Sequence, residues 1–273
     1  MKEHAQETYY GTSDQTFYGN PFADEFRCES FLFQGMHACV VFPPEGTANG
    51  KWLLKTVYFG AFPELEMDLL RRGYHLAYID GQSRWGLEAD LACKADFIRH
   101  ISAQYGLNPR CVPIGMSAGG CVALKLAAAY PELVSVLYLD AACVNLLSCP
   151  MGFGRSRCRE MPELADEMLA DLSLTRQSVL AYRSAPIDRL ETLAQSRIPA
   201  VVVYGCEDKT VPYEENGALL EALYRREGLP LLVIAKAGCD HHPHGVPDDS
   251  PVIRFIETYD TDDLHERTKT FGQ

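Results

Sequence analysis

The segment Gly115-Met116-Ser117-Ala118-Gly119-Gly120 carries the clearest chemical pattern in the sequence. It has the form G-x-S-x-G and joins an apolar run, 111–115, to an alanine- and leucine-rich run, 118–130, which predict a strand followed by a helix. A serine on such a tight turn projects its hydroxyl from the backbone, and small neighbours let strand and helix approach. The Ala118 N–H, at the helix start, would face a developing oxyanion. We predict that Ser117 is a nucleophile and Ala118 an oxyanion donor; the alternative is a glycine- and serine-rich turn without chemistry.

A serine hydroxyl needs a base, and the base needs an orienting acid. A loop with two acidic residues, Glu207 and Asp208, follows an apolar run at 200–204 that predicts a strand. Such a loop, at the carboxyl end of a parallel strand, lies where active sites are built. Asp208, one turn past Gly205, is our choice for the acid, and Glu207 is the alternative. A purely structural Asp208 would instead cap the next helix or pair with Lys209.

A cluster of histidines, His241-His242-Pro243-His244, follows the next predicted strand, 231–235. His241 comes directly after the Gly-x-x segment that leaves this strand, so we predict that it is the general base. His242 is the second choice, and we expect His244 to pack against or hydrogen-bond with its neighbours. A zinc site is the competing interpretation. Because adjacent histidines on a loop are expected to point in different directions, we predict no metal and no cofactor.

The second oxyanion donor should come from the loop at 59–64, after a strand predicted at 52–59. Gly60 lets the backbone come close there, so the Ala61 N–H is our choice and the Phe62 N–H the alternative. The aromatic residues Phe59, Phe62 and Trp85 are candidates for either the pocket or the core. The residues that we expect to line the substrate pocket are Phe62, Trp85, Met116 and His242.

Strand and helix patterns alternate from residue 52 onward, which predicts an α/β protein with a mainly parallel, doubly wound sheet. A hairpin at 28–33 and 36–42 should add an antiparallel edge. The remaining predicted strands are 74–79 and 134–139, and the remaining predicted helices are 63–72, 87–105, 213–226 and 252–258. The stretch 141–198 breaks the alternation with helical patterns at 161–172 and 175–185. We interpret it as a helical lid inserted in a single domain, 1–273, with 149–185 over the pocket.

The composition excludes several classes of function. The 273 residues carry a net charge of −12 and no dense run of Lys and Arg, so we expect no nucleic-acid partner and no anionic membrane surface. The first residues hold no apolar targeting segment, which predicts a cytoplasmic protein unless the sequence starts at the mature end of an exported one. The ten scattered cysteines are expected to be reduced and mostly buried, including Cys206 and Cys239 beneath the acid and base. The oligomeric state stays open.

With these motifs in this order, the sequence from about 40 to 259 resembles the α/β-hydrolase superfamily. Three phrases resemble a bacterial branch described as prolyl-oligopeptidase-like or acetylxylan-esterase-like: Phe59-Gly60-Ala61-Phe62-Pro63-Glu64, Arg72-Gly73-Tyr74-His75-Leu76-Ala77-Tyr78-Ile79-Asp80 and His241-His242-Pro243-His244. The resemblance implies a serine hydrolase that cleaves a small carboxylic ester, such as an acylated carbohydrate, through an acyl-enzyme. The alternatives are a small-peptide hydrolase with the same triad and a catalytically inactive binding protein.

Overall fold

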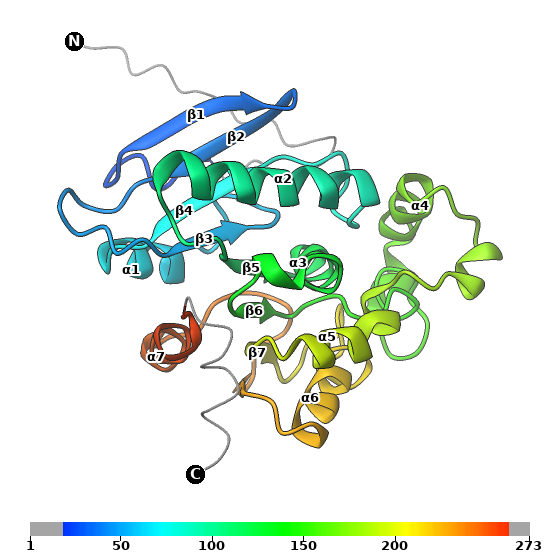
Figure 1. The fold of residues 1–273 in the computed structure, drawn as a ribbon. Helices are drawn as coiled ribbons and strands as arrows, with labels where there is room; N and C mark the ends of the chain where they lie inside the picture. Colours follow the sequence, from blue (N-terminus) through cyan, green and yellow to red (C-terminus); the bar gives the residue numbers. More distant parts are fainter. Residues whose placement is uncertain (1–18, 262–273) are drawn as a thin grey trace.

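The computed structural model describes residues 19–261, which form an eight-stranded sheet with the order β1-β2-β4-β3-β5-β6-β7-β8 (Figure 1). The strands β1 and β2 form an antiparallel hairpin, β2 pairs antiparallel with β4, and all other pairs are parallel. The mainly parallel sheet with an antiparallel edge, predicted from the sequence, is therefore confirmed. The strands are β1 (Cys28–Phe33), β2 (Met36–Val41), β3 (Trp52–Lys55), β4 (His75–Ile79), β5 (Val112–Met116), β6 (Leu137–Asp140), β7 (Ala200–Gly205) and β8 (Leu231–Lys236).

Helices cover both faces of the sheet because alternate side chains of a strand point to opposite sides. Leu53 of β3 packs with the apolar residues of α1 and α7, whereas Leu54 packs with those of α2 and α3. The helix α3 is buried along most of its length and also contacts α5 and α6 in a third apolar cluster. The helices are α1 (Glu64–Arg71), α2 (Glu88–Tyr105), α3 (Ala118–Ala129), α4 (Pro162–Asp171), α5 (Leu190–Ser196), α6 (Gly217–Arg226) and α7 (Ser250–Tyr259).

Two predicted strands are shorter in the structure than in the sequence pattern. The strand predicted at 52–59 ends at Lys55, and the chain then turns through Tyr58 at a φ of 60°. The Thr56 hydroxyl lies within hydrogen-bond distance of the carbonyls of Ile114 and Gly119, at 3.0 and 2.8 Å. The strand predicted at 134–139 begins only at Leu137. The early turn after Lys55 matters for function because it forms the loop beside the nucleophile.

Two predicted helices differ in a similar way. The helix predicted at 213–226 begins only at Gly217, because Asn216 has a non-helical conformation and its side-chain oxygen accepts from the N–H groups of Val144 and Asn145. The helix predicted at 175–185 is wrong: only the 3₁₀ turn Ser178–Ala181 forms there. Local hydrogen bonds between the Thr175 and Ser178 side chains and backbone compete with helix formation.

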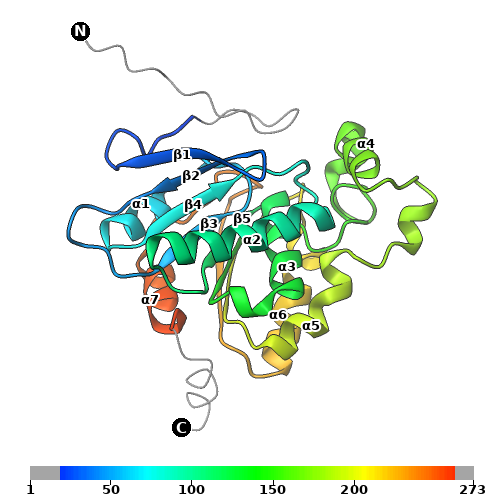
Figure 2. The same ribbon diagram turned by 45° about the horizontal axis from the view of Figure 1, so that its top comes forward.

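The insertion at 141–198 extends away from the sheet, with α4 and the segment that follows it in its outer part (Figure 2). Its last part differs from the expected lid, since α5 packs on α3 and α6 as one of the helices that cover the sheet. The part that can reach the site therefore precedes α5. Within residues 19–261, no helix combines the length and apolarity that crossing a membrane would require.

Candidate active site

Ser117 occupies a strained turn between β5 and α3, with φ of 51° and ψ of −120°. A left-handed conformation of this kind costs a non-glycine residue about 1–3 kcal/mol and persists only where the surroundings enforce it. Here the Ser117 N–H donates to the Asp140 carbonyl at 2.9 Å, which ties the turn to the end of β6. A Cβ on Gly115 would come within 2.8 Å of the Gly119 carbonyl oxygen, and one on Gly120 within 2.2 Å of the Ala142 Cβ. The small residues of the motif are thus required by close packing.

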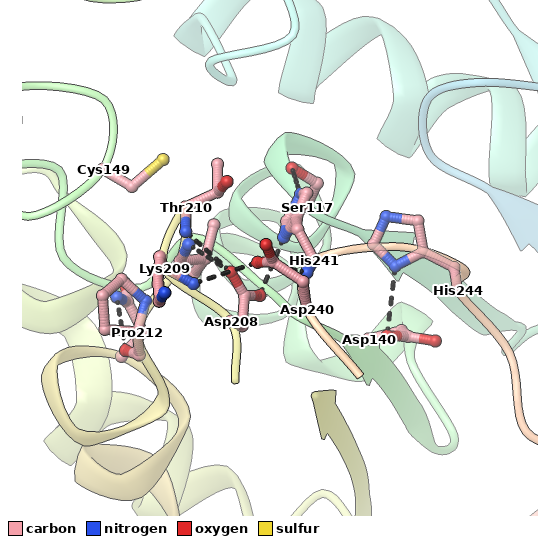
Figure 3. Close-up of polar contacts among 12 residues, drawn as sticks. Ser117, Asp140, Cys149, Asp208, Lys209, Thr210, Pro212, Asp240, His241 and His244 are labelled. Atoms are coloured by element: carbon pink, nitrogen blue, oxygen red, sulfur yellow. Dashed lines mark hydrogen bonds and ion pairs between the residues drawn. The ribbon is translucent and has the colours of Figure 1, made fainter. Parts of the chain in front are cut away.

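The structure brings Ser117, His241 and Asp208 together in one hydrogen-bonded line (Figure 3). His241 Nε2 lies 3.1 Å from Ser117 Oγ, and His241 Nδ1 lies 2.8 Å from Asp208 Oδ2. The other carboxylate oxygen of Asp208 accepts the N–H groups of Thr210 and Val211, both at 2.8 Å. These bonds orient the carboxylate, which in turn fixes His241 with its Nε2 toward the serine hydroxyl.

The choice between the two acidic residues of the loop follows from their placement. Asp208 is buried against His241, whereas Glu207 is exposed and its N–H donates to the Cys239 carbonyl. That bond joins the acid loop to the histidine loop. Cys206 is exposed and Cys239 half-buried, so the expectation that both are buried beneath the triad is wrong. They lie on the solvent side of these loops because the Asp208 and His241 side chains fill the interior.

A second carboxylate, which the sequence analysis did not single out, supports the same two loops. Asp240 Oδ1 accepts the N–H of His241 at 2.8 Å and that of Lys209 at 3.2 Å. Its other oxygen pairs at 3.0 Å with Arg157, which comes from the insertion. Arg157 also donates to the Thr210 hydroxyl at 2.9 Å. Asp240 and Arg157 thus connect the insertion, the acid loop and the base loop.

The oxyanion donors require one correction. Ala118 begins α3, so its N–H lies at the positive end of that helix beside Ser117. The Ala61 N–H, however, donates to the Tyr58 carbonyl at 3.0 Å inside the turn and is not available to a substrate. Phe62, our alternative, has a φ of 46°, and its N–H has no hydrogen-bond acceptor among residues 19–261. Ala61, Phe62 and Ala118 all line the same cavity as Ser117, so it is the Ala61 N–H bond to Tyr58 that makes Phe62 the better second donor.

A fully buried ion pair lies beneath this loop. The side chains of Lys55 and Glu66 have no exposed surface and contact each other directly. Lys55 Nζ also donates to the Ala61 carbonyl at 3.0 Å and lies 3.6 Å from the Met116 sulfur. The pair therefore links the end of β3, the helix α1 and the residue before Phe62. It has no local sequence signature, because an isolated Lys and Glu eleven positions apart resemble surface residues.

The cavity at Ser117 has a volume of about 270 Å³ and includes His241, Ala118 and all four residues expected in the substrate pocket. Phe59, by contrast, lies in the core, where its ring is 5.2 Å from that of Phe22. The insertion supplies one wall of the cavity; its lining residues are Cys143, Cys149, Arg157, Met161 and Leu164. A larger cavity of about 590 Å³ lies elsewhere, around Lys125 and Tyr182, and contains no member of the triad.

One side of the cavity has a charged border. Arg84 forms an ion pair with Glu167 of α4, and Trp85 Nε1 donates to the same carboxylate at 3.0 Å. The pair is only partly exposed to solvent, with 15% of the Arg84 side chain accessible. These contacts join the insertion to the loop after β4 and hold the Trp85 indole in the cavity wall.

The three neighbouring histidines converge, contrary to the expected divergence. One ring nitrogen from each of His241, His242 and His244 lies within 4.8 Å of the others. His244 Nδ1 is 3.1 Å from the buried carboxylate of Asp140, and the His242 ring stacks on Phe62. Partial burial, with His241 and His244 nearby, lowers the pKa of His242 to about 4. The His244 ring is therefore held by a buried carboxylate, and the exposed His242 ring lies against Phe62; the loop sequence alone reveals neither contact.

Three thiols lie in a row beside the cavity, and two of them, Cys143 and Cys149, line it. Cys149 Sγ lies 3.6 Å from that of Cys143 and 3.3 Å from that of Cys158, and hydrogen bonding with these two thiols raises the pKa of Cys149. All ten cysteines are free in the structure, and six are buried.

No protein-family model matches the chain, and no curated protein matches it. Solved structures do match. An acylaminoacyl peptidase from Pyrococcus horikoshii is 14% identical with a TM-score of 0.61, covering 79% of this chain and 37% of that one. A puromycin hydrolase is 17% identical with a TM-score of 0.62, covering 88% and 38%.

A third structure, an acylaminoacyl peptidase in complex with Z-Gly-Gly-Phe-chloromethyl ketone, is 15% identical with a TM-score of 0.65 and covers 89% and 44%. The chain has the α/β-hydrolase fold. It spans less than half of the length of each of these three structures. At such low identity the likeness concerns the fold, so the chemistry has to be argued from the site.

Proposed function

We propose that the protein is a serine hydrolase that forms an acyl-enzyme on Ser117. The observation that carries the proposal is the hydrogen-bonded line from Asp208 through His241 to Ser117, at 2.8 and 3.1 Å. These distances lie in the range expected for a nucleophile, its base and the orienting acid. The strained turn at Ser117 supports it, because such a conformation is retained where it serves a site.

In the proposed mechanism, His241 Nε2 accepts the Ser117 proton as Oγ attacks the substrate carbonyl. Asp208 keeps the Nδ1 proton of His241 in place and stabilises the imidazolium. The N–H groups of Ala118 and Phe62 bind the oxyanion. His241 then protonates the leaving group, and water, deprotonated by His241, releases the acyl group from Ser117.

For the substrate, a small peptide or acylated amino acid has better support than the acylated carbohydrate that the sequence resemblance favoured. Three of the structures with the same fold are named acylaminoacyl peptidase or puromycin hydrolase. The cavity of about 270 Å³ is enclosed partly by the insertion, and it matches one side chain or a short acyl group better than a sugar chain. Apolar and aromatic groups, such as Met161, Leu164 and Trp85, form much of its wall.

A matched pair of substrates tests the proposal. N-acetyl-phenylalanine p-nitroanilide and the corresponding p-nitrophenyl ester differ only in the bond cleaved, and acetylated xylose represents the carbohydrate ester. We expect the wild type to hydrolyse the anilide and the ester and to release little acetate from the sugar. In Ser117→Ala, both hydrolysis rates should fall to the residual rate that the oxyanion hole alone supports. Efficient deacetylation of the sugar without anilide cleavage would contradict the peptide proposal and restore the ester. Activity in Ser117→Ala well above that residual rate would refute the mechanism itself.

A further inference from the structure

The three histidine rings that line the cavity form a group that could hold a metal ion. Their centroids are separated by 4.8 Å (His241–His242), 5.1 Å (His241–His244) and 5.0 Å (His242–His244). Each pair of rings meets edge to face, at interplanar angles of 79°, 79° and 76°. Three imidazoles around one point in this way can each direct a nitrogen to a common ion.

Two of these rings are held by buried carboxylates on the side away from that point. Nδ1 of His241 faces Asp208, and Nδ1 of His244 faces Asp140; neither carboxylate has any exposed surface (Figure 3). Metal-binding histidines usually donate their second ring N–H to a carboxylate in this manner, which fixes the tautomer and strengthens the ligand. The nitrogen left for an ion is therefore Nε2 on both rings.

We propose that His241, His242 and His244 form an inhibitory site for a divalent transition-metal ion such as Zn²⁺, in which the ion competes with the Ser117 hydroxyl for His241 Nε2. A neutral imidazole whose Nδ1–H donates to Asp208 has one free ring-nitrogen lone pair, at Nε2. That lone pair either accepts the Ser117 proton or binds the ion. The inhibitory part of this inference rests on the proposed hydrolase function, whereas the binding part does not.

The ligand set determines which ions fit. Three imidazole nitrogens with room for a water molecule match zinc, whose Zn–N bonds are about 2.0–2.1 Å long. Mg²⁺ and Ca²⁺ prefer oxygen ligands and do not fit the site. Nitrogens up to 4.8 Å apart have to approach further, and His242, which is exposed, is the ring that can move. The carboxylates of Asp140 and Asp208 offset the charge of the ion.

Zinc binding is measured directly, by competition with a chromogenic chelator, on the wild type, Ser117→Ala, His242→Ala and His37→Ala. The last is the control, an exposed histidine on β2. We expect one Zn²⁺ per wild-type chain, no change in His37→Ala and at least about 100-fold weaker binding in His242→Ala, since even the loss of a supporting residue costs 10–100-fold. Ser117→Ala should bind about fivefold more tightly, because one competing hydrogen bond is gone.

Equal affinity in the wild type and His242→Ala would overturn the site. So would a sulfur-to-metal charge-transfer band in the Co²⁺ complex, which would place the ion on the cysteines beside the cavity. For the inhibitory part, labelling of the wild type by a fluorophosphonate should slow at Zn²⁺ concentrations near the measured Kd, and labelling of His37→Ala should slow equally. Zinc that binds without slowing the reaction would refute the competition. A protein that is not labelled even without zinc would refute the proposed function, and the binding isotherms would still decide the site.

Discussion

Substitution of the buried Lys55–Glu66 pair should show whether this pair holds the loop beside Ser117 in place. Both side chains are fully buried, and Lys55 also holds the carbonyl of Ala61, the residue before the proposed oxyanion donor Phe62. Removing one partner of a buried pair leaves an uncompensated charge and costs about 3–5 kcal/mol. Glu66→Leu and Lys55→Met should each lower the free energy of unfolding by this amount, or Tm by about 6–20 °C.

The double variant Lys55→Met, Glu66→Leu should behave differently in stability and in activity. Without a buried charge, its free energy of unfolding should return to within about 1–2 kcal/mol of the wild type, because apolar replacements of buried pairs are often neutral. Its kcat should remain at least about tenfold low, with KM little changed. The Ala61 carbonyl has lost its donor, and a misplaced oxyanion donor can cost up to about 10²–10³ in kcat.

Urea unfolding and steady-state kinetics on the four proteins provide the measurements. The exposed pair Arg226–Glu191 offers a control, since Glu191→Gln should change stability by less than about 1 kcal/mol. Single variants as stable as the wild type would show that the pair is not structural. A double variant with wild-type kcat would refute the positioning role of Lys55.

Three further predictions follow from other parts of the molecule. Burial and nearby carboxylates, Asp68 foremost, raise the pKa of Asp249 to about 6, so its ionised form destabilises the fold above that pH and not below about pH 4. For a half-buried group the destabilisation amounts to about 1–2 kcal/mol. Asp249→Asn should therefore raise Tm by a few degrees at pH 7.5 but not at pH 4. Asp248→Asn is the control and should give no such rise, because hydrogen bonds from Ser250 lower the pKa of Asp248. His241→Ala should reduce kcat about as much as Ser117→Ala, and His242→Ala clearly less; kinetics with the reverse order would make His242 the base. Titration of the denatured protein should find ten thiols with or without reductant, and a shortfall of two without reductant would reveal a disulfide.

The parts of the site that the sequence predicted are those with a local physical signature. Ser117 lies in a tight turn that only small neighbours permit, and Asp208 and His241 each follow a predicted strand in the order that this fold requires. Parallel strands bring their carboxyl ends to the same edge of a sheet. Residues that each follow such a strand are therefore expected to lie close together, although they are far apart in the sequence.

The parts that the sequence did not predict depend on contacts between distant residues. Arg157 and Asp240 pair across the insertion and the base loop, and Lys55 and Glu66 across a strand and a helix. Each is an ordinary charged residue until the fold brings its partner close. The prediction of Ala61 as an oxyanion donor was wrong for a related reason. The apolar pattern predicted a strand up to residue 59, whereas the chain turns at Tyr58, and the Ala61 N–H donates to the Tyr58 carbonyl inside that turn.

The central claim is that Ser117 is a nucleophile activated by His241 and Asp208. The most direct measurement is covalent labelling of the purified wild type by a fluorophosphonate, with the modified residue located by peptide mass spectrometry and with Ser117→Ala and Asp208→Asn labelled in parallel. We predict one label per chain on Ser117, none on Ser117→Ala, and labelling of Asp208→Asn slowed by orders of magnitude, because His241 loses the group that fixes its tautomer. A folded wild type that takes up no label, or takes it up on another residue, would contradict the account.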